Sequence, residues 1–234
     1  MSDLAEIAEI EELDCRYEPR EWAFAVERRP EIDAHWEKLV ARTPAMFNGR
    51  VLVMHRRALH GSLFSGAYLD TDYASFLAWR DFGYPDDAVT NCFAMGALTS
   101  REGHYLLGIM GPHTANAGMI YFPAGTPDLN DIVGSMVDLS RNVLRELQEE
   151  TGLEPGDVEV EPGWTMVALP PRIAFMRRLR SDLPSAELKA RIEQNLARQD
   201  KPELAGIHVV AGRPDLSDAM PAFQRAYLAH ALRI

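Results

Sequence analysis

The sequence predicts an α/β fold with a layered core. Three observations support this class. The 234 residues are 47% hydrophobic, which is enough to bury a sizeable core. Runs of apolar residues with strand character alternate with helical patterns along the chain. One helical pattern, Leu139 to Thr151, is strongly periodic and ends at Gly152, a residue that favours the left-handed conformation after a helix.

The N-terminal half begins with an acidic stretch, residues 1–16, which we expect to be a loose lead-in. A helix is expected from Pro30 to Arg42, because proline suits a first helical turn and Ile32, Trp36 and Leu39 follow at helical spacing. The other expected elements of this half are strands at Val51–His55 and Leu63–Leu69 and a short helix at Tyr73–Trp79 capped by Asp70 or Asp72.

After a break at residues 83–87, the second half opens with a hairpin signal: two apolar runs flank the turn-rich segment 99–103. The expected strands of this half are Cys92–Leu98, Tyr105–Met110, Met119–Phe122, Thr165–Leu169, Ile173–Leu179 and Ile207–Val210. The expected helices are Leu139–Thr151, Ala186–Arg198 and Pro221–Leu232.

Charge and cysteine content exclude several classes of function. The formal net charge is −11, so the surface would repel the phosphates of nucleic acids. Cys15 and Cys92 form no short-spaced pair, which argues against a disulfide framework or a zinc site. Met1 to Glu12 lacks the features of a secretory signal, and no apolar run is long enough to span a membrane. We therefore expect a soluble, cytoplasmic protein.

The stretch Arg145 to Leu153 carries the clearest chemical signal. On a helix, Glu146 has Glu149 and Glu150 as its neighbours three and four residues on, so the three carboxylates share one edge. They also lie near the helix C-terminus, where the helix dipole favours cations. Both the repulsion between these like charges and their unfavourable position in the helix dipole destabilise the helix. A hard divalent cation bound by oxygen ligands would compensate both effects.

This stretch resembles the Nudix family, whose signature is Gly-x5-Glu-x7-Arg-Glu-U-x-Glu-Glu-x-Gly-U, with U an aliphatic residue. Arg145 through Leu153 matches the second half of that signature throughout. In the first half, Val137 stands at the position of the earlier Glu. The strand and turn Phe122 to Gly125 lie 20 residues before the Arg instead of 14, which indicates a longer loop at residues 126–137.

The resemblance implies a Nudix fold, a mixed β-sheet sandwiched between helices, over residues 91–234. Residues 1–90 would be an α+β extension forming a substrate-side subdomain. It also implies a pyrophosphohydrolase that uses Mg²⁺ or Mn²⁺ and a small-molecule nucleotide substrate. A homodimer is common in the family, although no residue here demonstrates one.

The resemblance implies roles for particular residues. Glu146, Glu149 and Glu150 would hold the metal with the backbone of Gly125, and Arg145 would orient the acidic cluster. The general base would be a Glu of the helix or a residue of a late loop, for which Glu203 is the best candidate. Carboxylates that could replace the missing Glu at Val137 are Asp128, Asp131 and Asp138.

Candidate groups for substrate binding come from the strands that follow. Arg172 would contact phosphate oxygens, and Arg177, Arg178 and Arg180 are further cations nearby. Tyr121 or Trp164 would stack on a base. Ordinary structural roles remain open for all of these residues.

Short sequence segments in the N-terminal half, such as Phe76 to Phe82, resemble the N-terminal region of Nudix proteins that cleave UDP-sugars. This resemblance favours a nucleoside diphosphate sugar as substrate. ADP-ribose, suggested by Pro170-Pro171, and coenzyme A derivatives are the alternatives. A Nudix-fold sensor that binds a nucleotide with little or no turnover is the alternative from another functional class.

Overall fold

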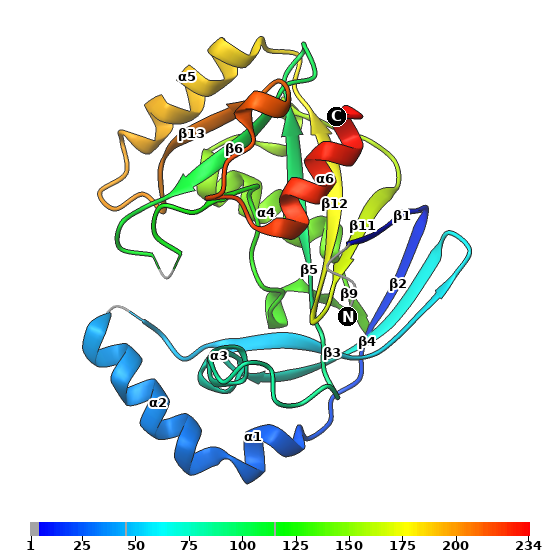
Figure 1. The fold of residues 1–234 in the computed structure, drawn as a ribbon, viewed down its shortest axis with the longest axis vertical. Coiled ribbons are helices and arrows are strands. Elements are labelled where there is room, and N and C mark those ends of the chain that lie inside the picture. The colour runs from blue at the N-terminus through cyan, green and yellow to red at the C-terminus, as the bar shows by residue number, and fades with distance from the viewer. Residues whose placement is uncertain (1–4, 45, 115) are drawn as a thin grey trace.

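The computed structural model describes residues 5–44, 46–114 and 116–234 (Figure 1). The strands are β1 (Glu6–Ile10), β2 (Glu12–Tyr17), β3 (Arg50–His60), β4 (Leu63–Asp72), β5 (Asn91–Thr99), β6 (Tyr105–Met110), β7 (Ile120–Tyr121), β8 (Ile132–Val133), β9 (Met136–Val137), β10 (Glu159–Val160), β11 (Trp164–Leu169), β12 (Arg172–Arg180) and β13 (Leu204–Val210). The α-helices are α1 (Ala23–Glu27), α2 (Arg29–Arg42), α3 (Tyr73–Asp81), α4 (Leu139–Thr151), α5 (Ser185–Leu196) and α6 (Ala222–Leu232). Short 3-10 helices cover Leu129–Asp131, Pro155–Asp157 and Arg213–Asp215.

The larger sheet has the strand order β1-β11-β12-β5-β6-β13, with β10 paired to β12 and β7 paired to β6. It is mixed, because β12 runs parallel to β5 while β11 runs antiparallel to β12. Strand β5 is buried on both faces. Cys92 and Ala94 belong to one hydrophobic core and Met95 and Ala97 to the other, as the alternation of side chains along a strand requires.

Helices cover both faces of this sheet. Val143 of α4 and Ile192 of α5 are buried in the first core, and Phe223 and Leu228 of α6 are buried in the second. Figure 1 shows α6 on one side of β12 and α4 on the other. The predicted arrangement, a mixed sheet sandwiched between helices, is confirmed.

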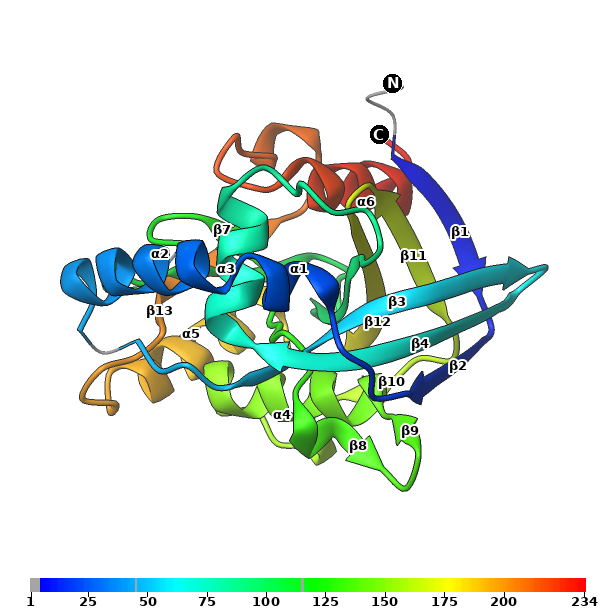
Figure 2. The same ribbon diagram turned by 90° about the horizontal axis from the view of Figure 1, so that it is seen from below.

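The smaller sheet has the order β3-β4-β2-β9-β8 and packs with α1, α2 and α3 around a third core. Each sheet contains strands from both sides of residue 90. Strand β1 pairs with β11 in the larger sheet, as Figure 2 shows, and β9 pairs with β2 in the smaller one. These exchanged strands join the N-terminal part of the chain to the rest by backbone hydrogen bonds.

Most predicted elements are present, with ends that differ by a few residues. Helix α4 spans the predicted residues, and its C-cap Gly152 has a φ of 73°. The side chain of Asn195 would lie within 2.3 Å of a Cβ at Gly152, so only glycine lets α4 end against α5. Among the described residues, no helix is both long and apolar enough to cross a membrane.

Two predictions about irregular segments are wrong. The described part of the expected lead-in forms β1 and β2, because these strands find partners in β11 and β4, far along the sequence. The expected loop at 126–137 contains the hairpin β8–β9, whose Met136 pairs with Arg16. Val137 is buried in the first core at 4% exposure, which explains an apolar residue at that position.

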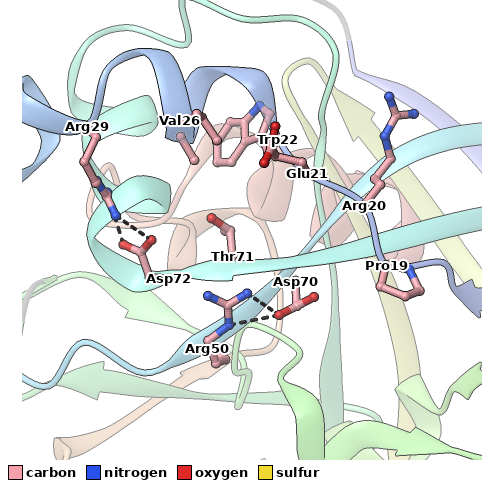
Figure 3. Close-up of a pocket in the computed structure, with 11 residues that line it drawn as sticks. Pro19, Arg20, Glu21, Trp22, Val26, Arg29, Arg50, Asp70, Thr71 and Asp72 are labelled. Atoms are coloured by element: carbon pink, nitrogen blue, oxygen red, sulfur yellow. Dashed lines mark hydrogen bonds and ion pairs between the residues drawn. The ribbon is translucent and has the colours of Figure 1, made fainter.

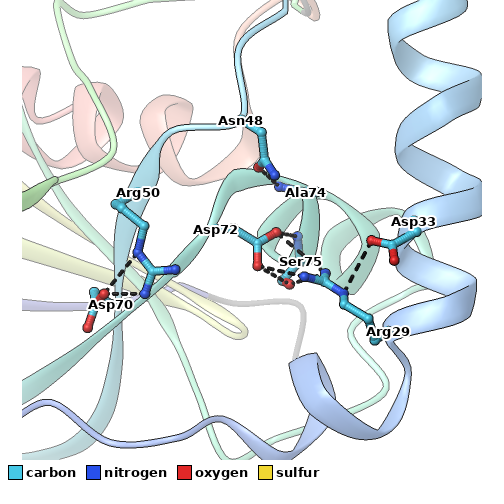
Figure 4. A network of polar contacts seen from close by, with 8 residues as sticks. All are labelled: Arg29, Asp33, Asn48, Arg50, Asp70, Asp72, Ala74 and Ser75. Atoms are coloured by element: carbon cyan, nitrogen blue, oxygen red, sulfur yellow. Dashed lines mark hydrogen bonds and ion pairs between the residues drawn. The ribbon is translucent and has the colours of Figure 1, made fainter.

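A network of polar contacts fixes the start of α3 (Figure 4). The Asp72 carboxylate accepts hydrogen bonds from the Ser75 backbone N–H at 2.9 Å and from Arg29 of α2 at 3.0 Å. Asn48 accepts a bond from the backbone N–H of Ala74 at 2.8 Å. Asp72 is therefore the cap, one of the two that the sequence allowed, and it ties α3 to α2.

Replacing this cap is expected to destabilise the chain. Asp72→Ala removes both the capping bond and the ion pair with Arg29, so the free energy of unfolding should fall by about 1–2 kcal/mol. Urea unfolding followed by circular dichroism measures the change. The control is Asp182→Ala, whose side chain is 90% exposed and should change stability little. Equal effects of the two substitutions would contradict the role of the cap.

Candidate active site

Two carboxylates of α4 lie against the turn that follows β7. Glu150 is buried at 6% exposure, and its Oε1 accepts a hydrogen bond from the Ala124 N–H at 3.2 Å. The carboxylate of Glu146 lies beside Gly125, because a Cβ built there would be 2.1 Å from the Glu146 Oε1. The turn thus approaches the helix closely enough that its backbone and both carboxylates share one small space.

Arg145 organises the acidic groups around it. Its Nη1 lies 2.7 Å from Glu146 Oε1 and 3.3 Å from Glu149 Oε2. Its Nη2 lies 3.2 Å from Asp131 Oδ2, a carboxylate with no exposed surface. Arg145 therefore contacts three carboxylates at once.

Asp131 is the acidic residue of the long loop that reaches this cluster. It also accepts a hydrogen bond from Asn142 Nδ2 at 2.9 Å, which holds it against α4. Asp138 instead caps α4 through the Arg141 N–H, and Asp128 caps the 3-10 helix that contains Asp131. Of the three candidates to replace the missing Glu at Val137, only Asp131 contacts Arg145.

Glu149 and Glu203 are more open to solvent. The Glu149 side chain is 59% exposed, and Glu203 is an exposed residue just before β13. The backbone carbonyl of Glu203 accepts a hydrogen bond from the Gly111 N–H at 2.7 Å, which fixes this segment beside the loop after β6. Glu203 is close enough to act electrostatically on both Glu146 and Glu150.

Burial and like charges make these carboxylates resist ionisation. Burial raises the pKa of Glu146 to about 7; the positive charge of Arg145 opposes this rise, and the negative charges of Glu149 and Glu203 add to it. Burial, with the charge of Glu203, raises the pKa of Glu150 well above its ordinary value. Burial also raises the pKa of Glu203, a shift that His113 opposes. A nearby cation would relieve all three groups.

The donor set fits a hard divalent cation. Within the described part of the chain, no three His, Cys, Asp or Glu side chains are already close enough to share a metal ion. Glu146 and the buried Glu150 nevertheless present carboxylate oxygens beside the backbone of the turn, and Glu203 carries a third carboxylate nearby. Oxygen donors of this kind are those that Mg²⁺ and Mn²⁺ prefer.

One cavity of about 440 Å³ brings together residues that the sequence singled out separately. Its lining includes Tyr121, Gly125, Glu150, Arg172 and Glu203. The carboxylate of Glu146 lies against Gly125, a residue of the turn that lines the cavity. Acidic groups and a guanidinium therefore face one space, which suits a ligand that carries phosphates.

A larger hollow of about 700 Å³ lies between α1, α2 and β4 (Figure 3). Two arginines of its lining are already paired: Arg29 lies 3.0 Å from Asp72, and Arg50 pairs with Asp70. Arg20 is a third arginine of the lining. None of the predicted site residues lines it. The smaller cavity is therefore the candidate active site.

Other cations near Arg172 in sequence lie elsewhere. Arg178 pairs with Glu161 at 3.3 Å, and Arg180 pairs with Glu159. The guanidinium of Arg177 lies 4.8 Å from the ring centre of Trp164, which is 7% exposed. Trp164 is consequently part of the core and does not line the cavity.

The cavity also contains groups that sequence reasoning missed. Tyr73, Phe76 and Arg80 of α3 line it, and Tyr84 contacts Arg172 beside it. The three helical residues are spaced by three and four, so they share a face of α3. That spacing was the available signal, but it could not show that this face of α3 would line the cavity.

Comparisons with known proteins match the fold weakly. No family model matches the sequence, and neither does any curated protein. The MutT protein from Methanosarcina mazei Go1 is 18% identical, with a TM-score of 0.38 over 62% of this chain and 95% of that chain. RenU, a Nudix hydrolase from M. smegmatis, is 14% identical, with a TM-score of 0.35 over 60% of this chain and 84% of that chain. The Bacillus subtilis pyrophosphohydrolase BsRppH is 15% identical, with a TM-score of 0.35 over 61% of this chain and 77% of that chain.

The contact between the turn and α4 predicts an effect of a single methyl group. In Gly125→Ala the new Cβ must displace the Glu146 carboxylate, whose side chain can move without unfolding the chain. Metal-dependent activity should fall at least about tenfold, because a misplaced catalytic group is costly, while the melting temperature changes little. The control is Gly156→Ala, which meets nothing within 4 Å. Full activity in a folded Gly125→Ala variant would exclude this contact from the site.

The raised pKa values predict how stability depends on pH without metal. The pKa of Glu146 rises from 4.5 to about 7 on folding, so the folded chain holds this proton more tightly than the unfolded chain. This contribution to stability is complete below pH 4.5 and is lost as pH rises toward 7; Glu150 extends the loss to higher pH. Glu150→Gln should therefore show a flatter decline than the parent chain.

Urea unfolding in EDTA, at a series of pH values from about 5 to about 9, measures this dependence. The exposed residue Glu187 provides the control, because Glu187→Gln should keep the steeper decline of the parent chain. Identical slopes for Glu150→Gln and the parent would show that Glu150 is ionised as readily in the folded chain as in the unfolded one.

Proposed function

We propose that the chain is a Nudix-type pyrophosphohydrolase that hydrolyses the diphosphate linkage of a small nucleoside diphosphate derivative with Mg²⁺ or Mn²⁺. The observation that carries the proposal is the position of Glu146 and the buried Glu150 against the Ala124–Gly125 turn, because Gly125, Glu150 and Arg172 line one cavity. The motif Arg145 to Leu153 supplies these carboxylates, and their surroundings suit a cation and phosphates together.

Each residue has a distinct task in this reaction. When bound, the divalent cation would neutralise phosphate oxygens and stabilise the charge that develops in the transition state. Glu146 and Glu150 would hold it, with Glu149 at the open edge, and Arg145 keeps Glu146 and Asp131 in place. Arg172 would bind a phosphate oxygen through its guanidinium, and Tyr121 would contact the nucleoside.

The bond changes follow from hydrolysis of a phosphoanhydride. A water oxygen forms a bond to one phosphorus while the bridging oxygen leaves with the electron pair of the broken P–O bond. The proton of the water passes to a carboxylate, for which Glu203 at the cavity wall is our candidate. The products are two phosphate monoesters.

The substrate proposed first is a nucleoside diphosphate sugar, followed by ADP-ribose and a coenzyme A derivative. The cavity supports a ligand with both an aromatic and an anionic part, because Phe76, Phe93 and Phe223 line it together with Arg172. A net charge of −11 supports a small ligand over a nucleic acid.

Product analysis tests this function directly. UDP-glucose, ADP-ribose, coenzyme A, a dinucleoside polyphosphate and a nucleoside triphosphate are each incubated with Mg²⁺, with Mn²⁺ and with EDTA, and products are identified by mass. We expect metal-dependent release of a nucleoside monophosphate from one of them. Glu150→Gln should lower kcat by roughly 10²–10³-fold, as expected when one group that stabilises the transition state is lost, while the fold is retained.

Failure of this test has a specific meaning. No cleavage by the folded parent chain, with a ligand of the panel still raising the melting temperature, would favour a nucleotide-binding sensor. Unchanged activity of a folded Glu150→Gln variant would remove the carboxylate cluster from the mechanism. Glu159→Gln, at a side chain 62% exposed and outside the cavity lining, is the matched control.

A further inference from the structure

Helix α3 of the N-terminal part brings a second guanidinium to the candidate active site. Arg80 lines the same cavity as Arg172 and Glu150. Its Nε donates to Asp81 Oδ1 at 2.7 Å, and Asp81 also contacts His35 at 2.9 Å. Among the described residues, the two Nη atoms of Arg80 have no hydrogen-bond acceptor, so they are available to a ligand in the cavity.

A residue of the same N-terminal part, Tyr84, contacts Arg172. Arg172 Nη2 donates to the hydroxyl of Tyr84 at 2.6 Å, and its guanidinium carbon lies 5.5 Å from the centre of that ring. Tyr84 has a φ of 59°, is hydrogen-bonded to the Trp79 carbonyl at 2.9 Å, and packs on the Trp79 ring at 4.8 Å. Its position is therefore fixed by the buried Trp79, and it orients Arg172 in turn.

The guanidiniums of Arg80 and Arg172 both act electrostatically on Tyr121, which also lines the cavity. Burial raises the pKa of Tyr121, and the positive charges of Arg172 and Arg80 both oppose that rise. The carboxylates Glu150 and Glu203 line the same cavity as these two arginines. The lining thus combines acidic and basic groups.

We propose that Arg80 and Arg172 form an anion subsite for a phosphate group of the substrate, and that Tyr84 is a positioning residue for Arg172. The inference rests on the proposed function in assuming a diphosphate substrate, and it assigns the substrate-binding role of the N-terminal part to particular residues. In the described part of the chain, these two arginines are the cations that line the cavity. Guanidinium forks match phosphate oxygens in geometry and charge.

Binding of monophosphates in EDTA tests the subsite without turnover. Uridine 5′-monophosphate and glucose 1-phosphate are titrated calorimetrically into the parent chain, Arg80→Gln and the control Arg101→Gln, whose arginine is exposed in the turn between β5 and β6. We expect Arg80→Gln to bind at least one of them about tenfold more weakly, since hydrogen bonds to charged groups are among the stronger ones. Arg101→Gln should bind as the parent does.

The two probes identify which phosphate the subsite holds. A loss for uridine monophosphate assigns it to the phosphate beside the nucleoside, and a loss for glucose 1-phosphate assigns it to the other half. Equal affinity of the parent and Arg80→Gln for both probes, or no binding of either to the parent, would overturn the proposal. If Arg80→Gln does not fold, Arg80→Lys, which keeps the charge and loses the fork, takes its place.

Tyr84→Phe tests the positioning role. The ring still packs on Trp79, but the hydroxyl that accepts from Arg172 is gone. With a substrate found in the panel, KM should rise severalfold while kcat and the melting temperature stay near those of the parent; an unchanged KM would reject the role. Because monophosphate binding needs no metal and no cleavage, the subsite can be supported even if hydrolysis fails, and rejected even if hydrolysis is found.

Discussion

The burial of Glu150 beneath the turn after β7 is the constraint on which the site depends. A carboxylate at 6% exposure, with a hydrogen bond from Ala124 and other carboxylates nearby, is costly to ionise. The cost falls only if a cation joins the group or if a proton stays on it. At Gly125 a Cβ would meet the Glu146 carboxylate, so the turn also approaches this second carboxylate closely. A divalent ion would relieve both groups, in keeping with the proposed function.

The parts of the fold that sequence could predict are those set by local chemistry. Helix α4 was predicted to its ends because Asp138 caps it, its apolar residues are periodic and Gly152 stops it. Strands β1 and β2 were missed because their sequences are short and acidic, and their stability comes from pairing with β11 and β4. No window of local sequence contains that information.

The candidate site likewise has acidic residues that local sequence could predict and basic residues that it could not. The spacing of Glu146, Glu149 and Glu150 on one helix is a local property, so the acidic side was predictable. The basic side was not. Arg178 shares a strand face with Arg172, but six residues of strand separate them by roughly 20 Å, so Arg178 lies beside Glu161 instead of in the cavity. Arg80 belongs to α3, which packs on the smaller sheet, and the fold brings one face of this helix to the cavity.

The charge distribution explains how an acidic chain can bind an anion. At physiological ionic strength, exposed charges are screened beyond about 8 Å, so most of the net charge of −11 has little effect inside a cavity. Arg80 and Arg172 act there at short range and in partly desolvated surroundings, where charge interactions are stronger. A long polyanion would meet the acidic exterior as well as the cavity. A small diphosphate would meet mainly the cavity, so this charge distribution would favour the proposed nucleotide derivative over a nucleic acid.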